Sequence, residues 1–352
     1  MPGPAAVWLP FFMGLKMKRA DYWELEGSAI RCRLCPRFCL IAEGQSGFCG
    51  VRAHYNAELE ALTYGKIVSW ACDPIEKKPL YHFYPGHKTF SIGGVGCNLR
   101  CRHCQNWQIS CAEAKQTLDS LRDLSPEAAV RSALDNGCQS LVWTYNEPSI
   151  WFEYIRDTAP LAQAAGLKTV LVTAGMICSE PLAELLPDID AYRLDVKGFS
   201  GDFYRWLTGV DCLEQVLDNG VTAFKAGCHV EIVTNLIPGH NDDEQQLRSL
   251  ARWIALELSP RTAWHLTAYY PNHQLDVAAT GLASLERGLE IAREEGLRHV
   301  YIGNVPGHPS QHSYCAACEK IVIRRAGFGT LENLLEGGCC PQCREPLGAY
   351  RG

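Results

Sequence analysis

The sequence predicts an α/β protein whose core is a partial, open (β/α)6-type barrel, with a cysteine-rich segment before the core and a small ribbon after it. Three observations support this prediction. Short apolar segments alternate with amphipathic segments, as in a parallel sheet with right-handed helical crossovers. Six or seven such units are too few for a closed eight-fold barrel. The 18 cysteines fall largely into three groups, of which the outer two flank the alternating segments.

The predicted core strands are rich in Val, Ile, Leu and aromatic residues, as buried parallel strands are. Ser125-Pro126 predicts a helix start, with serine as the N-cap and proline in the first turn. Gly166, Gly227 and Gly296 lie where helices should end before the next strand. A site should lie at the carboxyl ends of the strands. The strand segments are 89–95, 140–145, 169–173, 191–196, 229–236, 264–270 and 299–302.

Composition argues against several classes of protein. The net charge is -6 without a run of Lys or Arg, which disfavours a nucleic-acid binder. No apolar stretch reaches the length of a membrane span. We assign residues 1–26 to an N-terminal extension, because Met1 to Leu15 are apolar, contain prolines and lack the basic region of a secretory signal. We expect those residues to be a disordered extension or to precede the native start, and the protein to be cytoplasmic.

The central cysteine motif predicts an iron–sulfur site with an open position. Cys97, Cys101 and Cys104 have the spacing C-x3-C-x2-C and follow the first core strand. A [4Fe-4S] cluster normally takes four thiolates, so three cysteines leave one iron free. S-adenosylmethionine (SAM) can chelate that iron through its amino nitrogen and carboxylate. Three glycines within 93–96 have no side chains to obstruct a cluster near the backbone.

These motifs together resemble the radical SAM superfamily, within it the activases of pyruvate formate-lyase type, and more closely the AmmeMemoRadiSam system radical SAM enzyme family. The resemblance covers nearly the whole chain after Met17. It implies a radical SAM core at 88–305, whose catalytic [4Fe-4S] cluster reductively cleaves SAM to a 5'-deoxyadenosyl radical. The motifs that carry it are the Cys32–Cys49 group, 73–80, 97–107, Tyr145-Asn146-Glu147-Pro148, Asp195-Val196-Lys197 and the terminal ribbon.

The resemblance also implies a set of SAM contacts. Glu147 lies in the segment that matches the Gly-Gly-Glu-Pro motif of the superfamily, and it can accept from the SAM ammonium. Asp195 and Lys197 share one face of a strand, where they can bind SAM or form a structural salt bridge. Asn235 and His265 are assigned to the ends of the fifth and sixth strands. The complete implied set is His103, Asn146, Glu147, Thr173, Asp195, Lys197, Asn235 and His265.

The last cysteine group, in a segment at 306–352 that begins with a linker, predicts a metal ribbon. Two C-x-x-C pairs about twenty residues apart are typical of a four-thiolate zinc site, and iron can use the same ligands. We expect Cys339 to be the spare cysteine. The predicted ligands are Cys315, Cys318, Cys340 and Cys343.

The first cysteine group lies in a cysteine-rich segment at 27–87. Its four cysteines supply four thiolates, which can hold either zinc or a second iron–sulfur cluster. A cluster would relay electrons or bind substrate, whereas zinc would brace the fold. The residues are Cys32, Cys35, Cys39 and Cys49.

The predicted function is that of a radical SAM enzyme, an oxidoreductase or activase that abstracts hydrogen from its substrate. One version activates a glycyl-radical enzyme. Another modifies a small molecule or amino acid in a pathway linked to Memo-type and AMMECR-type proteins. The alternative from another class is a non-catalytic iron–sulfur or zinc protein, which the C-x3-C-x2-C spacing disfavours because two-cluster ferredoxins use C-x2-C-x2-C. Expected partners are an electron donor such as flavodoxin or ferredoxin, with no nucleic acid or membrane.

Overall fold

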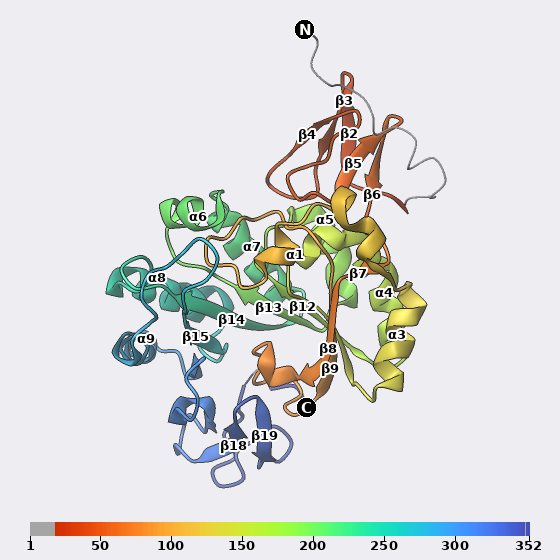
Figure 1. Ribbon diagram of the computed structural model, residues 1–352. Helices are drawn as coiled ribbons and strands as arrows, with labels where there is room; N and C mark the ends of the chain where they lie inside the picture. Colours follow the sequence, from red (N-terminus) through yellow and green to blue (C-terminus); the bar gives the residue numbers. More distant parts are fainter. Residues whose placement is uncertain (1–17, 349) are drawn as a thin grey trace.

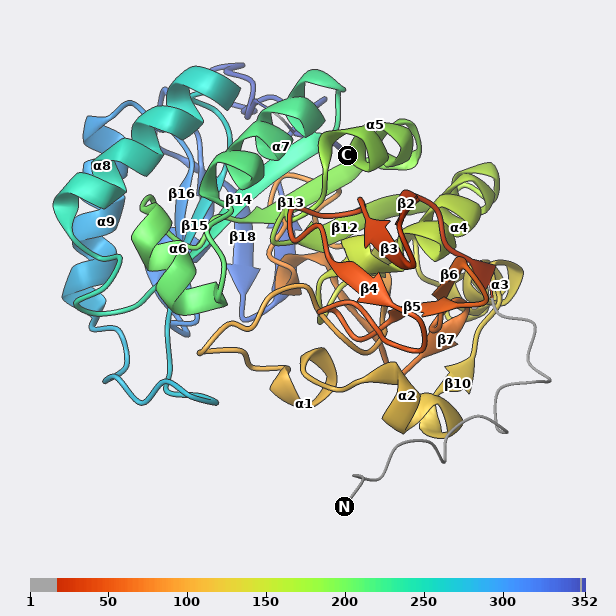
Figure 2. The same ribbon diagram turned by 90° about the horizontal axis from the view of Figure 1, so that it is seen from above.

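The core of the molecule is a curved, mostly parallel sheet with helices on its outer side (Figures 1 and 2). The computed structural model describes residues 18–348 and 350–352, so the expectation for Met1 to Leu15 lies outside the described residues. Eight strands follow the order β16-β15-β14-β13-β12-β11-β9-β8. β8 is antiparallel to β9, and the other neighbouring pairs are parallel. The barrel is open because β16 and β8 are its two edges.

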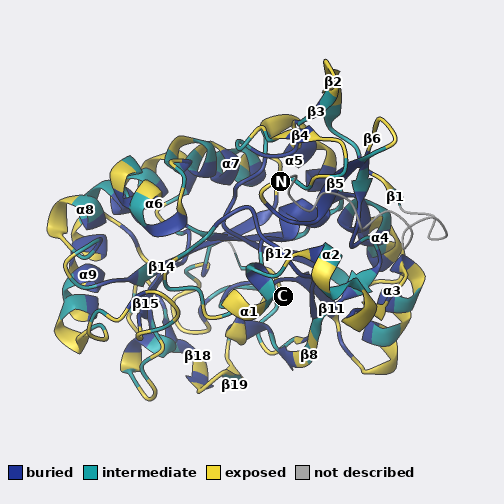
Figure 3. Cartoon of the chain, turned by 45° about the horizontal axis from the view of Figure 1, so that its top comes forward, coloured by how far each residue is buried: buried dark blue, intermediate teal, exposed yellow. Residues whose placement is uncertain are grey.

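The seven predicted core strands are all present and parallel, which confirms the fold class predicted from the alternating segments. They are β9 (Lys88–Gly93), β11 (Ser140–Trp143), β12 (Lys168–Thr173), β13 (Ala191–Asp195), β14 (His229–Leu236), β15 (Trp264–Ala268) and β16 (Val300–Gly303). Most of their residues are buried, as Figure 3 shows. A parallel strand covered on both faces needs this continuous apolar composition.

The helices follow the strands as the sequence predicted. α3 begins at the predicted position, because the Ser125 side chain accepts a hydrogen bond from the Ala128 amide at 3.2 Å. Among the described residues, none of the helices combines the length and the apolar composition needed to cross a membrane. The main helices are α3 (Pro126–Asp135), α4 (Phe152–Ala164), α5 (Ser179–Leu185), α6 (Gly201–Thr208), α7 (Leu213–Lys225), α8 (Glu244–Trp253), η5 (Ile254–Leu258) and α9 (Leu282–Glu294).

The segment before the core forms an N-terminal module of two small sheets, β2-β3-β4 and β1-β6-β5. Residues 18–26, which the sequence analysis assigned to an extension, form β1 and β2 and pair with β6 and β3. β8 lies within the predicted cysteine-rich segment but joins the core sheet. The strands are β1 (Lys18–Arg19), β2 (Trp23–Glu26), β3 (Ala29–Cys32), β4 (Leu40–Ala42), β5 (Arg52–Tyr55), β6 (Glu58–Ala61), β7 (Lys66–Ile67) and β8 (Ser69–Pro74).

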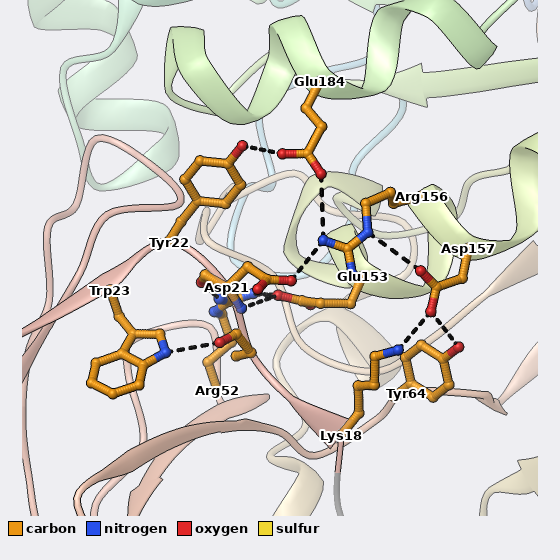
Figure 4. Close-up of polar contacts among 11 residues, drawn as sticks. Lys18, Asp21, Tyr22, Trp23, Arg52, Tyr64, Glu153, Arg156, Asp157 and Glu184 are labelled. Carbon is orange, nitrogen blue, oxygen red and sulfur yellow. Dashed lines mark hydrogen bonds and ion pairs between the residues drawn. The ribbon is translucent and has the colours of Figure 1, made fainter.

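Ion pairs fasten the N-terminal module to α4 and α5 (Figure 4). The central pair is Arg52 and Glu153, whose side chains are each 1% exposed and whose closest atoms lie 2.8 Å apart. Glu153 also accepts from the Asp21 amide at 2.9 Å, and Arg156 contacts the Asp21 carboxylate at 2.7 Å. Around this centre, Asp157 accepts from both Lys18 and Tyr64, and Tyr22 donates to Glu184.

The terminal ribbon lies at the opposite end of the barrel from the N-terminal module (Figure 1). It is built from β17 (Ser313–Tyr314), β18 (Ile321–Ala326) and β19 (Gly329–Asn333). Arg325 of β18 is 1% exposed and donates to the Tyr81 carbonyl at 2.7 Å and to Ser313 Oγ at 2.9 Å. The ribbon therefore closes this end of the barrel, and the carboxyl ends of the strands face the N-terminal module.

The buried ion pair gives the first testable expectation. Glu153→Gln should lower the free energy of unfolding by about 3–5 kcal/mol, because it leaves the Arg52 charge buried without its counter-charge. The matched control is Glu257→Gln in η5, an exposed position where a change within about 0.5 kcal/mol is expected. Urea titration of both variants measures the effect, and coincident unfolding curves would show that this pair does not hold the module.

Candidate active site and metal centres

The three cysteines of the central motif lie on the loop between β9 and α1 (Trp107–Ser110), at the carboxyl edge of the sheet. Burial raises the pKa of the Cys101 thiol to about 12; the Lys197 ammonium opposes this rise, and the neighbouring Cys104, Asp195 and Glu147 add to it. Burial raises the pKa of Cys97 as well. Because the thiolate is the form that binds iron, these thiols need bound metal to lose their protons at neutral pH.

Amide side chains hold the cysteine loop in place. Asn146 Nδ2 donates to the Gly96 carbonyl at 2.8 Å, and Asn106 Nδ2 donates to the Tyr145 carbonyl at 2.8 Å. Tyr145 has φ +76°, so it takes the left-handed conformation that a glycine readily adopts. Tyr145 and Asn146 stand where the resemblance places a glycine pair; Tyr145 has a positive φ, and Asn146 restrains the cysteine loop.

The glycine before Cys97 lies against the N-terminal module. Gly96 has φ +81°, and a Cβ on it would lie 2.3 Å from the carbonyl oxygen of Cys49. The missing side chain makes room for the N-terminal module. The approach of the Cys49 carbonyl is thus a reason for glycine at position 96 that the sequence alone did not reveal.

Glu147 links the ends of two neighbouring strands. Its carboxylate accepts from the Thr173 hydroxyl at 2.6 Å, the Ala174 amide at 2.7 Å and the Ser149 amide at 3.1 Å. Burial raises the pKa of Glu147, although these hydrogen bonds oppose the rise. A carboxylate has about four acceptor positions, so one remains for a further donor.

A row of charges lies beside the cysteine loop at the end of β13. Asp195 forms ion pairs with Lys197 at 3.0 Å and with Arg193. Burial opposes the charge of Asp195, but these two cations outweigh that penalty and lower its pKa. Arg193 was not among the predicted site residues, although its spacing of two from Asp195 placed both on one face of the strand.

His103 lies next to the charged side chains of Lys197 and Asp195. Burial, and then the Lys197 ammonium, lower the pKa of His103 to about 3, while Asp195 opposes the fall. The imidazole is therefore neutral. Its Nδ1 is buried and has no hydrogen-bond partner among the described residues.

The two remaining residues predicted to contact SAM, Asn235 and His265, lie at different ends of their strands. Asn235 is the penultimate residue of β14, and its Nδ2 donates to Thr267 Oγ1 at 3.0 Å. His265 is the second residue of β15, so its assignment to the carboxyl end of the strand is wrong. It is 1% exposed and its Nε2 lies 2.6 Å from Glu231 Oε2, in the buried interior of the barrel.

These residues fit a cluster that binds SAM. Three thiols supply three ligands and leave one cluster position open. The amino-acid part of SAM carries an ammonium and a carboxylate. Glu147 offers a free acceptor position for the ammonium, and the Arg193 and Lys197 cations offer donors for the carboxylate. The site therefore holds side chains of opposite sign for both charges of the ligand.

Comparison with known proteins agrees with this geometry. The model of the radical SAM superfamily matches residues 91–251. An uncharacterized protein of Methanocaldococcus jannaschii is 39% identical over 335 residues, which cover 94% of this chain and 99% of that protein. The chain belongs to the radical SAM superfamily. Membership implies a [4Fe-4S] cluster and SAM as cofactors, and it implies an enzyme.

Two further matches concern activating enzymes. The isethionate sulfite-lyase activating enzyme of Desulfovibrio desulfuricans is 24% identical over 182 residues, covering 48% of this chain and 56% of that protein. A crystal structure of a domain of pyruvate-formate lyase-activating enzyme from Bacteroides vulgatus is 19% identical, with a TM-score of 0.42. That match covers 47% of this radical SAM chain and 99% of the domain.

The terminal ribbon of this radical SAM protein contains a group of four cysteine thiols, separate from those of the central motif. The sulfur atoms of Cys315, Cys318, Cys340 and Cys343 all lie within 4.8 Å of one another, and Cys339 is not among them. The closest pairs are Cys315 with Cys343 at 3.4 Å and Cys318 with Cys340 at 3.6 Å. Four thiolates leave no open position, which is typical of a structural tetrahedral site.

We expect one zinc or iron ion in the ribbon. Cys318→Ser combined with Cys343→Ser should release that metal and expose the C-terminal segment to protease, because the ribbon has a small apolar core of its own. SAM cleavage should persist, since the SAM-facing residues lie at the other end of the barrel. Elemental analysis and a cleavage assay check both points, with Cys339→Ser as the control. An unchanged metal content in the double variant would contradict the site.

Proposed function

We propose that Cys97, Cys101 and Cys104 hold the catalytic [4Fe-4S] cluster of a radical SAM enzyme. When bound, the cluster and SAM supply a 5'-deoxyadenosyl radical that abstracts hydrogen from the substrate. One observation carries the proposal: the Cys101 thiol lies within the electrostatic influence of Lys197, Asp195 and Glu147, so three potential metal ligands and a set of charged side chains meet at the carboxyl edge of the sheet.

The chain's own residues orient SAM in this proposal. Glu147 accepts from the SAM ammonium through its remaining acceptor position, while Lys197 donates to the carboxylate. Asp195 keeps Lys197 charged, since the pKa of Lys197 is raised despite its burial, which opposes the charge. His103 offers a neutral ring surface to the adenine.

Three other residues have supporting roles. Thr173 fixes the Glu147 carboxylate, and Asn146 fixes the cysteine loop. Asn235 offers a polar group at the end of β14. We propose that residues 88–305 form this catalytic core.

Our first candidate for the substrate is a backbone glycine of a glycyl-radical enzyme. The similarity over 182 residues to an enzyme named as an activating enzyme supports this version. A small molecule or amino acid, in a pathway with Memo-type and AMMECR-type proteins, is the second candidate, because the N-terminal module and ribbon extend the chain beyond the matched core at 91–251. Both versions use an electron donor such as flavodoxin or ferredoxin, and we place the reaction in the cytoplasm.

The two versions differ in where the radical ends. With deuterated substrate, anaerobic incubation transfers deuterium to 5'-deoxyadenosine in either version. A persistent glycyl radical on an added protein, seen by electron paramagnetic resonance, would identify an activase. A new small-molecule mass without such a radical would identify the second version.

Removal of one central ligand tests the core of the proposal. Cys101→Ala should abolish SAM-dependent formation of 5'-deoxyadenosine, because two thiolates cannot hold the site-differentiated cluster. The matched control is Cys72→Ala, an exposed cysteine on β8, which should retain wild-type cleavage. Undiminished cleavage by Cys101→Ala would reject the proposed ligand set.

The charged contacts form a separate prediction. Glu147→Gln should weaken SAM binding by roughly ten- to hundredfold, the loss of about 1.5–3 kcal/mol expected for a hydrogen bond to a charged group. Asp195→Asn should also weaken SAM binding, because Lys197 loses its counter-charge. Iron content should stay near that of the wild type. Asp202→Asn, at an exposed position on α6, should leave SAM affinity unchanged. Calorimetric titration distinguishes these outcomes, and wild-type affinity in both site variants would leave the two carboxylates with a structural role alone.

A further inference from the structure

The N-terminal module contains a cysteine-lined pocket that the proposed SAM chemistry does not use. Cys32, Cys35, Cys39 and Cys49 all line it. Four potential thiolates therefore converge on one hollow.

The spacing of these sulfurs differs from that in the ribbon. A zinc ion with bonds of about 2.3 Å draws four sulfurs to within roughly 4 Å of one another. The ribbon cysteines gather in this way, whereas in the described chain the four N-terminal cysteines do not form such a group. In a [4Fe-4S] cluster each thiolate binds a different iron, so the sulfurs stand on the order of 6 Å apart around a central volume. In the described chain the N-terminal cysteines share this wider spacing with the cysteines of the central motif, which also do not gather within 4.8 Å of one another.

Two cationic side chains supply unused donors to the same pocket. Arg52 is 1% exposed, and its Nε has no hydrogen-bond partner in the described structure. Arg37 Nη2 is likewise buried without a partner. Both residues line the pocket. Donors of this kind hydrogen-bond to cluster sulfurs and tune the reduction potential, and their positive charge offsets the thiolates.

The pocket adjoins the loop of the radical SAM cysteines. The Cys49 carbonyl occupies the space where a Gly96 side chain would stand. Asn98, directly after Cys97, lines the N-terminal pocket, and its carbonyl accepts from Arg37 Nε at 2.5 Å. The two cysteine groups thus share a wall made of residues 96–98.

We propose that Cys32, Cys35, Cys39 and Cys49 hold a second [4Fe-4S] cluster, which relays electrons to the radical SAM cluster. The relay role rests on the proposed function. A reduced flavodoxin-type donor gives one electron to the second cluster, which becomes reduced by one electron and returns to its oxidised state when it passes that electron on. Four protein thiolates leave no open iron for a substrate, so the site favours a relay.

Metal analysis of anaerobically reconstituted full-length protein tests the assignment. The wild type should contain about eight iron atoms, with equal sulfide, from two clusters. A triple variant, Cys97→Ala, Cys101→Ala and Cys104→Ala, should keep about four iron atoms and a reduced electron paramagnetic resonance spectrum that SAM does not change. Cys35→Ala should lose the other cluster and keep the SAM-responsive spectrum. Cys72→Ala should match the wild type.

The outcomes separate this inference from the proposed function. A triple variant without iron, or an N-terminal site that holds zinc in place of iron, would overturn the proposal of a second cluster. Retention of about four iron atoms by the triple variant supports it, whether or not the wild type cleaves SAM. The relay is tested with Cys35→Ala under reduced flavodoxin: SAM cleavage should fall at least tenfold, and a wild-type rate would overturn the relay.

Discussion

The close approach of the N-terminal module to the cysteine loop is the constraint on which the site depends. The Cys49 carbonyl lies where any side chain at position 96 would collide with it. This contact requires that the module be held firmly against the barrel, and the buried Arg52–Glu153 pair provides the hold. On the other side of the loop, the Asn146 side chain restrains the backbone by donating a hydrogen bond to the Gly96 carbonyl. The position of Cys97 is thus set jointly by the module and by the end of β11.

Much of the core could be predicted from sequence because its strands are buried on both faces. Such strands are continuous apolar runs, and all seven were identified. β8 was missed as part of the sheet, since it is an edge strand in which exposed Trp70 and buried Asp73 break the apolar pattern. β1 and β2 were missed because two- and four-residue strands with mostly exposed side chains carry little periodic signal.

The site was predictable where local motifs carry it and less so where partners are distant in sequence. The pairing of Asp195 with Lys197 was expected from their spacing of two, although β13 ends at Asp195 and Lys197 lies just beyond the strand. The unpartnered donors of Arg37 and Arg52 depend on packing between separate segments, which no local spacing reveals. His265 was placed at the wrong end of its strand, although a parallel strand that starts at Trp264 puts His265 near the amino edge. Its partner, Glu231, comes from the neighbouring strand.

Arg52 connects the stability of the module to the contents of its pocket. One nitrogen of its guanidinium binds Glu153, while Nε is buried without a partner and the residue lines the cysteine pocket. A buried donor without an acceptor costs about 1–3 kcal/mol. Under the proposed assignment, the cluster sulfurs satisfy this donor, so filling the pocket stabilises the same module that presses against Gly96. Under this assignment the N-terminal cluster supports the position of the catalytic loop as well as supplying electrons to it.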